Sequence, residues 1–253
     1  MRSLGVVPFV PPGCAVAPWP KVVRVEPSAQ VIPATTLRFY VTFDRPARGR
    51  VHQDEVKLLT AEGAPLPSPF MDFGQELWSP DGRRLTVLID PGRVKRDVEA
   101  PGSEVAPLRQ GGRYQVAIGD YRQSFLVGPA IRQPLDAGKW RVAVPGQSGD
   151  GVAVEFDRVM DAALLADQLM VVTPDGRLVD GEIRIDGGGL IWRFIPRTAW
   201  AAGSYRILLG PVLEDVSGNR IDEALDHDVG SPAAPSRSIT LPFTVPSMLQ
   251  VSP

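Results

Sequence analysis

The sequence predicts an all-β protein built from two tandem antiparallel β-sandwiches, one in each half of the chain. Proline and glycine number 26 and 25 among 253 residues, which suits many short strands joined by turns. Apolar and polar residues alternate along several segments, as half-buried strands require. Three landmarks also recur in the same order: Val41–Arg45 as Val154–Arg158, Leu85–Pro91 in outline as Leu190–Pro196, and Gly112–Tyr114 as Gly203–Tyr205.

Composition and charge are those of a globular protein and argue against a nucleic-acid-binding or membrane-spanning protein. Hydrophobic residues make up 43% of the chain and charged residues 22%, which are ordinary values for a globular protein. The formal net charge of −2 provides no field that would draw the chain to nucleic acid. No apolar run approaches the roughly 20 residues that a membrane-spanning helix needs. We therefore expect no nucleic-acid partner and no integral membrane span.

The strongest strand signals in the first half are Leu37–Phe43 and Leu85–Ile89. In Leu37–Phe43 every second residue is apolar, which places those side chains on one face. Leu85–Ile89 is largely apolar and follows the Asp-Gly turn signal at residues 81–82, so we expect it to lie deep in the sandwich. The other strands expected in this half are Val22–Val25, Val56–Leu59, Tyr114–Ile118 and Ser124–Val127.

The second half repeats this pattern with one short helix inserted. Asp161–Gln168 is the best helical stretch in the chain and is about two turns long. The strands expected here are Trp140–Val144, Val152–Phe156, Leu169–Val172, Glu182–Ile185, Leu190–Ile195, Tyr205–Leu209 and Ile239–Val245.

These elements divide the chain into five parts. We expect an irregular leader over residues 1–20, a sandwich over 21–128, a linker over 129–138, a second sandwich over 139–246 and a tail over 247–253. Pro129 and Pro134 should stiffen the linker. The first sandwich carries two long loops, Leu66–Gln75 and Arg93–Pro107, and the second carries Asp222–Ser236.

The order of short motifs resembles the bacterial Ig-like domains of S-layer and other cell-envelope proteins. The matching pieces are a strand that ends in Phe-Asp-Arg, an apolar strand that ends in proline, a Gly-x-Tyr strand and an Asp-x-x-Gly-Asn turn. The resemblance implies an Ig-like sandwich fold, export to the cell envelope and a structural or adhesive role. It covers residues 21–246, and the first half lacks the Asp-x-x-Gly-Asn element. The matches are Phe43–Pro46, Ile89–Pro91, Gly112–Tyr114, Phe156–Arg158, Phe194–Pro196, Ala202–Tyr205 and Asp215–Asn219.

The resemblance places the chain in the cell envelope or periplasm, although no clear signal peptide opens the sequence. The apolar run Leu4–Val10 is interrupted by proline, and no small-residue cleavage site follows it. Gly13-Cys14 is similar to the end of a lipoprotein processing site, but the prolines before it favour an idle or buried thiol.

The long loop Arg93–Pro107 is the first candidate for a binding site. Arg93, Lys95 and Arg96 form a local basic patch, with Arg83 and Arg84 close in sequence, that suits a phosphate, an acidic sugar or the acidic face of a partner. The alternative is a solvated charge run balanced by the acidic residues of the same loop. Long loops on rigid sandwiches often carry function, so an envelope protein or glycan is the partner we expect here.

An acidic segment around Asp215 is the second candidate. Asp215, Asn219 and Asp222 offer the oxygen ligands that calcium prefers, although their spacing is not that of an EF-hand. The alternative is a turn in which Asp215 accepts backbone hydrogen bonds and Gly218 or Asn219 takes a positive φ.

Catalytic and cofactor motifs do not emerge from the sequence. With His52 and His227 as its two histidines, the chain shows no nucleophile element beside either, and nothing selects a carboxylate pair for glycoside hydrolysis. The tryptophans and the aromatics Phe70 and Phe73 suit sugar stacking, but core or edge packing is the better interpretation. We therefore expect a non-enzymatic structural or spacer protein without a cofactor. The alternatives are a carbohydrate- or protein-binding module and accessory domains of an enzyme encoded elsewhere.

Overall fold

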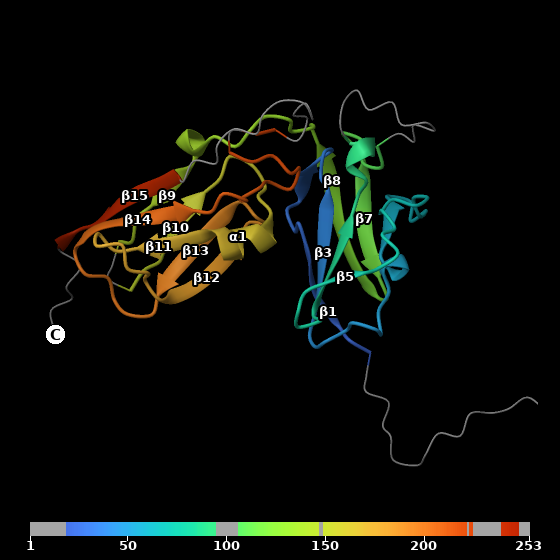
Figure 1. Ribbon diagram of the computed structural model, residues 1–253. Coiled ribbons are helices and arrows are strands. Elements are labelled where there is room, and N and C mark those ends of the chain that lie inside the picture. Colours follow the sequence, from blue (N-terminus) through green and yellow to red (C-terminus); the bar gives the residue numbers. More distant parts are fainter. Residues whose placement is uncertain (1–18, 95–105, 147–148, 222, 225–238, 248–253) are drawn as a thin grey trace, which may run out of the picture.

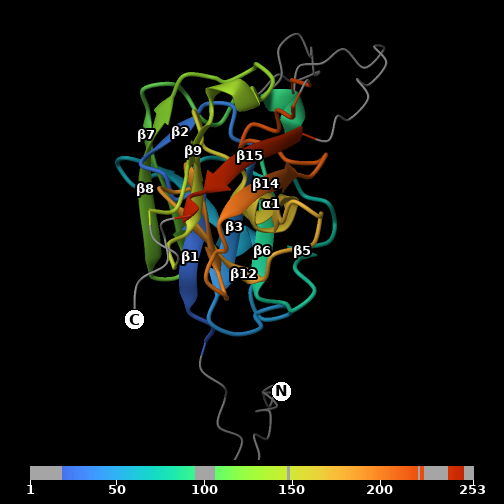
Figure 2. The ribbon, with the colours of Figure 1, turned by 90° about the vertical axis from the view of Figure 1, so that its left-hand side faces the viewer.

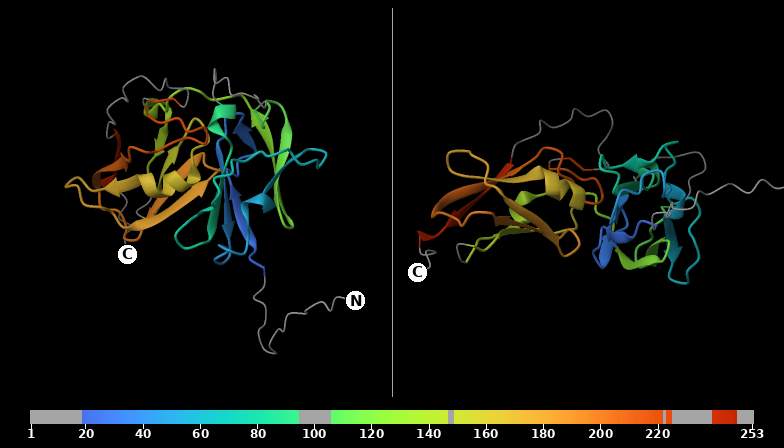
Figure 3. Two further views of the ribbon diagram at one scale, coloured as in Figure 1. Left: turned by 45° about the vertical axis from the view of Figure 1, so that its right-hand side comes forward. Right: turned by 90° about the horizontal axis from the view of Figure 1, so that it is seen from below.

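The computed structural model describes residues 19–94, 106–146, 149–221, 223–224 and 239–247. Within these ranges the chain is all-β, with one short helix (Figure 1). Two Ig-like sandwiches lie side by side, and both views of Figure 3 keep them apart as distinct bodies. Figure 2 looks along the second sandwich toward the first. The fold class expected from the sequence is therefore confirmed.

The first sandwich pairs a sheet of order β1-β3-β6-β5 with a sheet of order β2-β8-β7-β4. Neighbouring strands are antiparallel, except that β2 runs parallel to β8. The strands are β1 Val22–Glu26, β2 Val31–Pro33, β3 Arg38–Phe43, β4 Lys57–Thr60, β5 Leu77–Trp78, β6 Arg84–Leu88, β7 Arg113–Ile118 and β8 Tyr121–Gly128.

Alternation along β3 and β6 builds the core of this sandwich. Phe39, Val41 and Phe43 on β3 are buried, as are Leu85 and Val87 on β6, so these alternate side chains fill the space between the sheets. The residues between them, on both strands, point to the outer face of the sheet. That outer face is the one that meets the second sandwich, and its polar residues shape the junction described below.

The second sandwich pairs a sheet of order β12-β13-β10-β9 with a sheet of order β11-β14-β15. Its own hydrophobic cluster is centred on Trp192, which is fully buried. The helix α1 begins where the Asp161 carboxylate accepts hydrogen bonds from two free N–H groups of the first turn. The elements are β9 Arg141–Ala143, β10 Val152–Glu155, α1 Ala162–Gln168, β11 Leu169–Val172, β12 Gly181–Asp186, β13 Ile191–Pro196, β14 Gly203–Leu209 and β15 Ile239–Val245.

The two sandwiches share one strand order, with a single difference. The orders β1-β3-β6-β5 and β4-β7-β8 of the first match β9-β10-β13-β12 and β11-β14-β15 of the second. An aromatic pair recurs at the same place: Tyr114 stacks on Phe125, and Tyr205 stacks on Phe243. The first sandwich alone adds β2 beside its last strand. In the second, the corresponding edge of β15 has no strand partner within the described residues.

Thirteen expected strands and the expected helix coincide with observed elements to within three residues at each end. β2 and β5 were not expected, because each has only two or three residues and gives no periodic signal. The five-part division of the chain stays a prediction. The leader, Cys14, most of the loop Arg93–Pro107 and most of Asp222–Ser236 lie outside the described residues. Among the described residues, no helix is both long and apolar enough to cross a bilayer.

Candidate functional site

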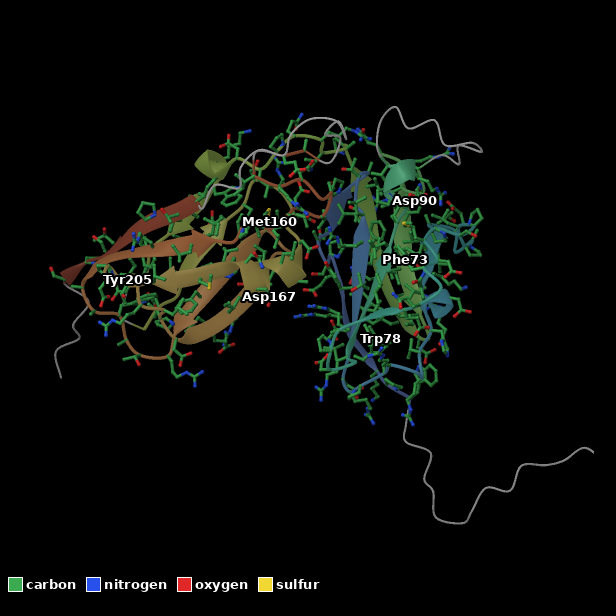
Figure 4. All side chains as sticks on the ribbon, viewed as in Figure 1. Phe73, Trp78, Asp90, Met160, Asp167 and Tyr205 are labelled. Carbon is green, nitrogen blue, oxygen red and sulfur yellow. The ribbon has the colours of Figure 1, made fainter. Side chains whose placement is uncertain are left out.

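The most distinctive site is the junction where the second sandwich meets the outer face of β3. In Figure 1 the end of the second sandwich that carries α1 abuts the sheet that contains β1 and β3. Figure 4 places Met160 and Asp167 on that same side. Strand alternation points Phe39 into the core, so its neighbours Arg38 and Tyr40 face outward, toward this contact.

Charged and polar side chains join the two bodies at the junction. The Tyr40 hydroxyl donates a hydrogen bond to Asp161 Oδ2 at 2.7 Å, and both residues are buried. Arg38 lies between two carboxylates: its Nε is 3.5 Å from Asp161 Oδ2, and its guanidinium Nη2 donates to Glu214 Oε2. Arg220 closes the cluster on the far side of Glu214, with its Nε 2.8 Å from Glu214 Oε1.

Burial sets the electrostatics of this cluster. Burial raises the pKa of the Asp161 carboxyl above its ordinary value, while Arg38 and the Tyr40 hydroxyl oppose that rise. Burial likewise raises the pKa of Glu26, against the opposing charges of Arg24 and Arg84. The pKa of the Tyr40 phenol is raised by burial and by the nearby Asp161 charge, so Tyr40 stays a hydrogen-bond donor at neutral pH.

A main-chain hydrogen bond, a pair of side-chain hydroxyls and two valines also cross the same junction. The Leu37 N–H donates to the Val216 carbonyl at 2.9 Å, and the Thr35 and Ser217 hydroxyls lie 2.6 Å apart. Val216 and Val159, although they belong to the second half of the chain, pack into the hydrophobic cluster of the first. The junction therefore combines hydrogen bonds, ion pairs and buried apolar surface.

One glycine fixes how closely the two bodies approach. Gly188, in the turn between β12 and β13, has a φ of +70°. A Cβ at this position would lie 2.2 Å from the Ala29 nitrogen of the first sandwich. Only glycine fits that gap. Of the three consecutive glycines in this turn, Gly188 is the one that serves a backbone approach between the sandwiches.

The charged groups of the junction hold the two sandwiches together. Its closest carboxylates, Asp161 and Glu214, share Arg38 and are covered by both sandwiches, so they are held as partners in ion pairs. Sequence reasoning did not identify this site. Tyr40, a large aromatic on the otherwise polar face of β3, was the available signal.

Only part of the predicted basic site can be placed. Lys95 and Arg96 lie outside the described residues. Arg93 ends a short 3₁₀ turn, donates to the Ser68 carbonyl at 2.9 Å and lines an open hollow of about 470 Å³ with Arg109 and Tyr114. Arg83 and Arg84 line a different hollow. The two hollows lie at opposite ends of the first sandwich. In Figure 4, Asp90 marks the end with the Arg93 hollow and Trp78 marks the end with the Arg83 and Arg84 hollow.

Asp215 and Asn219 come together in a buried turn, while Asp222 lies outside the described residues. Asp215 Oδ1 accepts from the N–H groups of Ser217 and Asn219, and Oδ2 accepts from the Asn219 amide and from Arg158. Gly218 takes a φ of +78°. This geometry is that of the turn considered as the alternative. The structure describes no group of three or more potential metal ligands among His, Cys, Asp and Glu in these ranges, and the calcium site stays a prediction.

The aromatic residues divide between core and surface. Trp140, Trp192 and Trp200 are buried in the second sandwich, as core packing requires. Phe73 is 42% exposed on the long loop of the first sandwich. That loop and η1, a 3₁₀ turn at Gln53–Glu55, line an open hollow of about 990 Å³, where Glu76 accepts hydrogen bonds from His52 and Trp78.

Comparisons with known proteins identify no family. No protein-family model matches the chain, and no curated protein matches it. Among solved structures, domains 4–9 of the surface layer protein SbsC align with 90% of this chain and 31% of that chain, at 10% identity and a TM-score of 0.25. The titin domains Z1Z2 align with 76% of this chain and 88% of that chain, at 14% identity and a TM-score of 0.22.

Group B Streptococcus pullulanase SAP also aligns, over 74% of this chain and 22% of that chain, at 11% identity and a TM-score of 0.25. The chain thus spans less than a third of the pullulanase and of the longer S-layer structure. At these scores the likenesses carry no argument about activity, substrate or partner, and the fold assignment rests on the sheets themselves.

Proposed function

We propose that the chain is a non-enzymatic structural module of the cell envelope, in which two Ig-like sandwiches form a rigid spacer. The observation that carries the proposal is the buried junction, where Arg38 and Tyr40 of one sandwich pair with Asp161 and Glu214 of the other. Buried ion pairs are poor sources of net stability, but a misplaced charge would lose its partner. We infer that these pairs fix the angle between the two sandwiches. A spacer needs such a fixed angle.

The envelope location rests on the order of the Ig-like motifs quoted above. Fractionation of cells that produce the native protein should recover it with the envelope. Recovery with the cytoplasmic fraction would contradict the envelope location but would not bear on the spacer role.

Rigidity is directly measurable with spin labels. Lys57 and Thr240 are exposed residues on strands β4 and β15 of the two sandwiches, so cysteines there report the angle between them. With Cys14→Ser as background, we expect one narrow distance distribution. The same labels in a Gly188→Ala background should give a broader one. A broad distribution with glycine at position 188 would contradict the spacer role.

A second candidate function is a binding module that uses the loop Arg93–Pro107. Arg93 supports it, because this side chain lies at the rim of an open hollow with Arg109 nearby. Combined reversal of Arg93, Lys95 and Arg96 to glutamate should then abolish binding to an envelope extract. Unchanged binding would rule out the binding module, and the spacer role would still stand.

A further inference from the structure

A row of side chains crosses the outer face of the first sandwich below the junction. The strand register pairs Arg24 of β1 with Thr42 of β3, and Thr42 with Arg84 of β6. Directly paired residues on one face of an antiparallel sheet have Cβ atoms about 4.5–5.5 Å apart. Arg24 and Arg84 therefore project from the same face of the sheet, one on each side of Thr42.

This row lies in an open hollow of about 680 Å³, which Arg83 also lines. The two acids on its wall are engaged elsewhere. Asp44 pairs with Arg45 and accepts from the Lys21 N–H, and Asp81 accepts from the Ser79 hydroxyl and the Arg83 N–H. Three arginines, Arg24, Arg83 and Arg84, line the hollow against the two aspartates, so its lining carries a net positive charge. Glu26, beside Arg24, also interacts with Arg84.

Two contacts position the arginines in advance. The Arg84 guanidinium lies 5.3 Å from the centre of the Tyr40 ring, a cation–π distance, and Tyr40 is itself fixed by Asp161 across the junction. Arg24 Nε lies 3.4 Å from Glu26. Each guanidinium has five N–H donors, and these contacts leave several of them for a ligand.

The Thr42 hydroxyl supplies a second, independent observation. Its oxygen is buried but has no hydrogen-bond partner among the described residues. Buried polar atoms are normally satisfied, and each exception calls for a missing partner. Thr42 lines the hollow between the two arginines.

We propose that Arg24, Thr42 and Arg84 form a binding site for an oxyanion, such as the carboxylate or phosphate group of a small ligand. Planar guanidinium groups bind both anions through paired N–H donors, and the threonine hydroxyl adds one more donor. The site is separate from the predicted loop site at Arg93 and does not depend on the spacer role.

Titration followed by ¹⁵N chemical shifts tests the site, with inorganic phosphate, sulfate, glucuronate and neutral glucose at matched ionic strength. We expect saturable shifts in residues around Thr42 with at least one anion and none with glucose. Preference for phosphate or sulfate would assign a tetrahedral anion, and preference for glucuronate would assign an acidic sugar. Linear, non-saturating shifts with all three anions would overturn the proposal.

Variants make the test specific. Arg24→Gln and Arg84→Gln should each weaken binding at least tenfold, and Thr42→Val should weaken it less. Arg113→Gln is the matched control, because Arg113 is an exposed arginine on β7 of the opposite sheet and should leave binding unchanged. Equal weakening by Arg113→Gln would overturn the site. Arg24 is 59% exposed, so the Arg24→Gln protein should fold even if Arg84→Gln disturbs Tyr40.

Discussion

The Tyr40 hydroxyl and the Asp161 carboxylate are 2.7 Å apart, although the two residues are separated by 121 positions in the chain. Asp161 has two tasks: its Oδ1 caps α1, and its Oδ2 accepts from Tyr40. The residue that starts the helix of the second sandwich thus also binds the first. Local helix structure and the angle between the two bodies are coupled through one carboxylate.

Tyr40→Phe should destabilise the protein by about 1–3 kcal/mol, because it leaves the buried Asp161 without one donor. Chemical denaturation of both proteins at neutral pH measures the difference in unfolding free energy. The control is Tyr121→Phe, whose hydroxyl lies 3.1 Å from Gln123 Oε1 in a half-buried position and should matter less. Equal losses of unfolding free energy in the two variants would show that the Tyr40–Asp161 hydrogen bond stabilises the protein no more than the Tyr121–Gln123 hydrogen bond does.

Gly188→Ala should push the two sandwiches apart where Gly188 meets Ala29. Its Cβ would overlap Ala29, and relief of such overlap costs about 1–3 kcal/mol beyond the strain of a positive φ. Small-angle scattering should report a larger radius of gyration. Gly176→Ala is the matched control, because Gly176 has a φ of +83° and nothing within 4 Å of its added Cβ. A compact Gly188→Ala protein would contradict the close approach.

Asn219→Ala should cost about 1–3 kcal/mol, because Asp215 Oδ2 and the Ile131 carbonyl each lose a donor. Thr173→Ala, which removes hydrogen bonds from an exposed turn, is the control with an expected smaller loss.

Thermal unfolding of the wild-type protein with calcium and with a chelator tests the calcium site at Asp215. Since four N–H groups already occupy Asp215, we expect no shift with calcium; a rise would support the calcium site.

Glu26 and Glu182, each replaced in turn by glutamine, should respond to pH with opposite signs. Burial raises the pKa of Glu26 above its ordinary 4.5, so wild type gains stability relative to Glu26→Gln as pH falls from 7 through that raised pKa to about 4. A hydrogen bond from the Arg184 guanidinium lowers the pKa of Glu182 below its ordinary 4.5. Its contribution is therefore present above pH 4.5 and is lost as pH falls below it. Denaturation of both variants at pH 7 and pH 4 measures the two slopes; slopes of the same sign would be inconsistent with these environments.

Sequence patterns predicted the sandwiches because alternation is a local property. Phe39, Val41 and Phe43 show the core face of β3 without knowledge of any other strand. The junction is different, because Arg38 and Glu214 are 176 positions apart and no spacing rule connects them. The same alternation did place Arg38 and Tyr40 on the outer face, but nothing local says what covers it. The acidic turn at Asp215 was predictable as a turn, since Asp and Gly have intrinsic reasons to form one.

The unmatched strand β2 has a mechanical consequence. If the chain carries tension between its two ends, the parallel pair β2 and β8 in the first sandwich is loaded in shear, so its hydrogen bonds resist together. Among the described residues the second sandwich has no counterpart of β2, and its last strand, β15, pairs with β14 alone. Under a pulling force we therefore expect the second sandwich to yield at lower load and to act as the extensible half of the molecule.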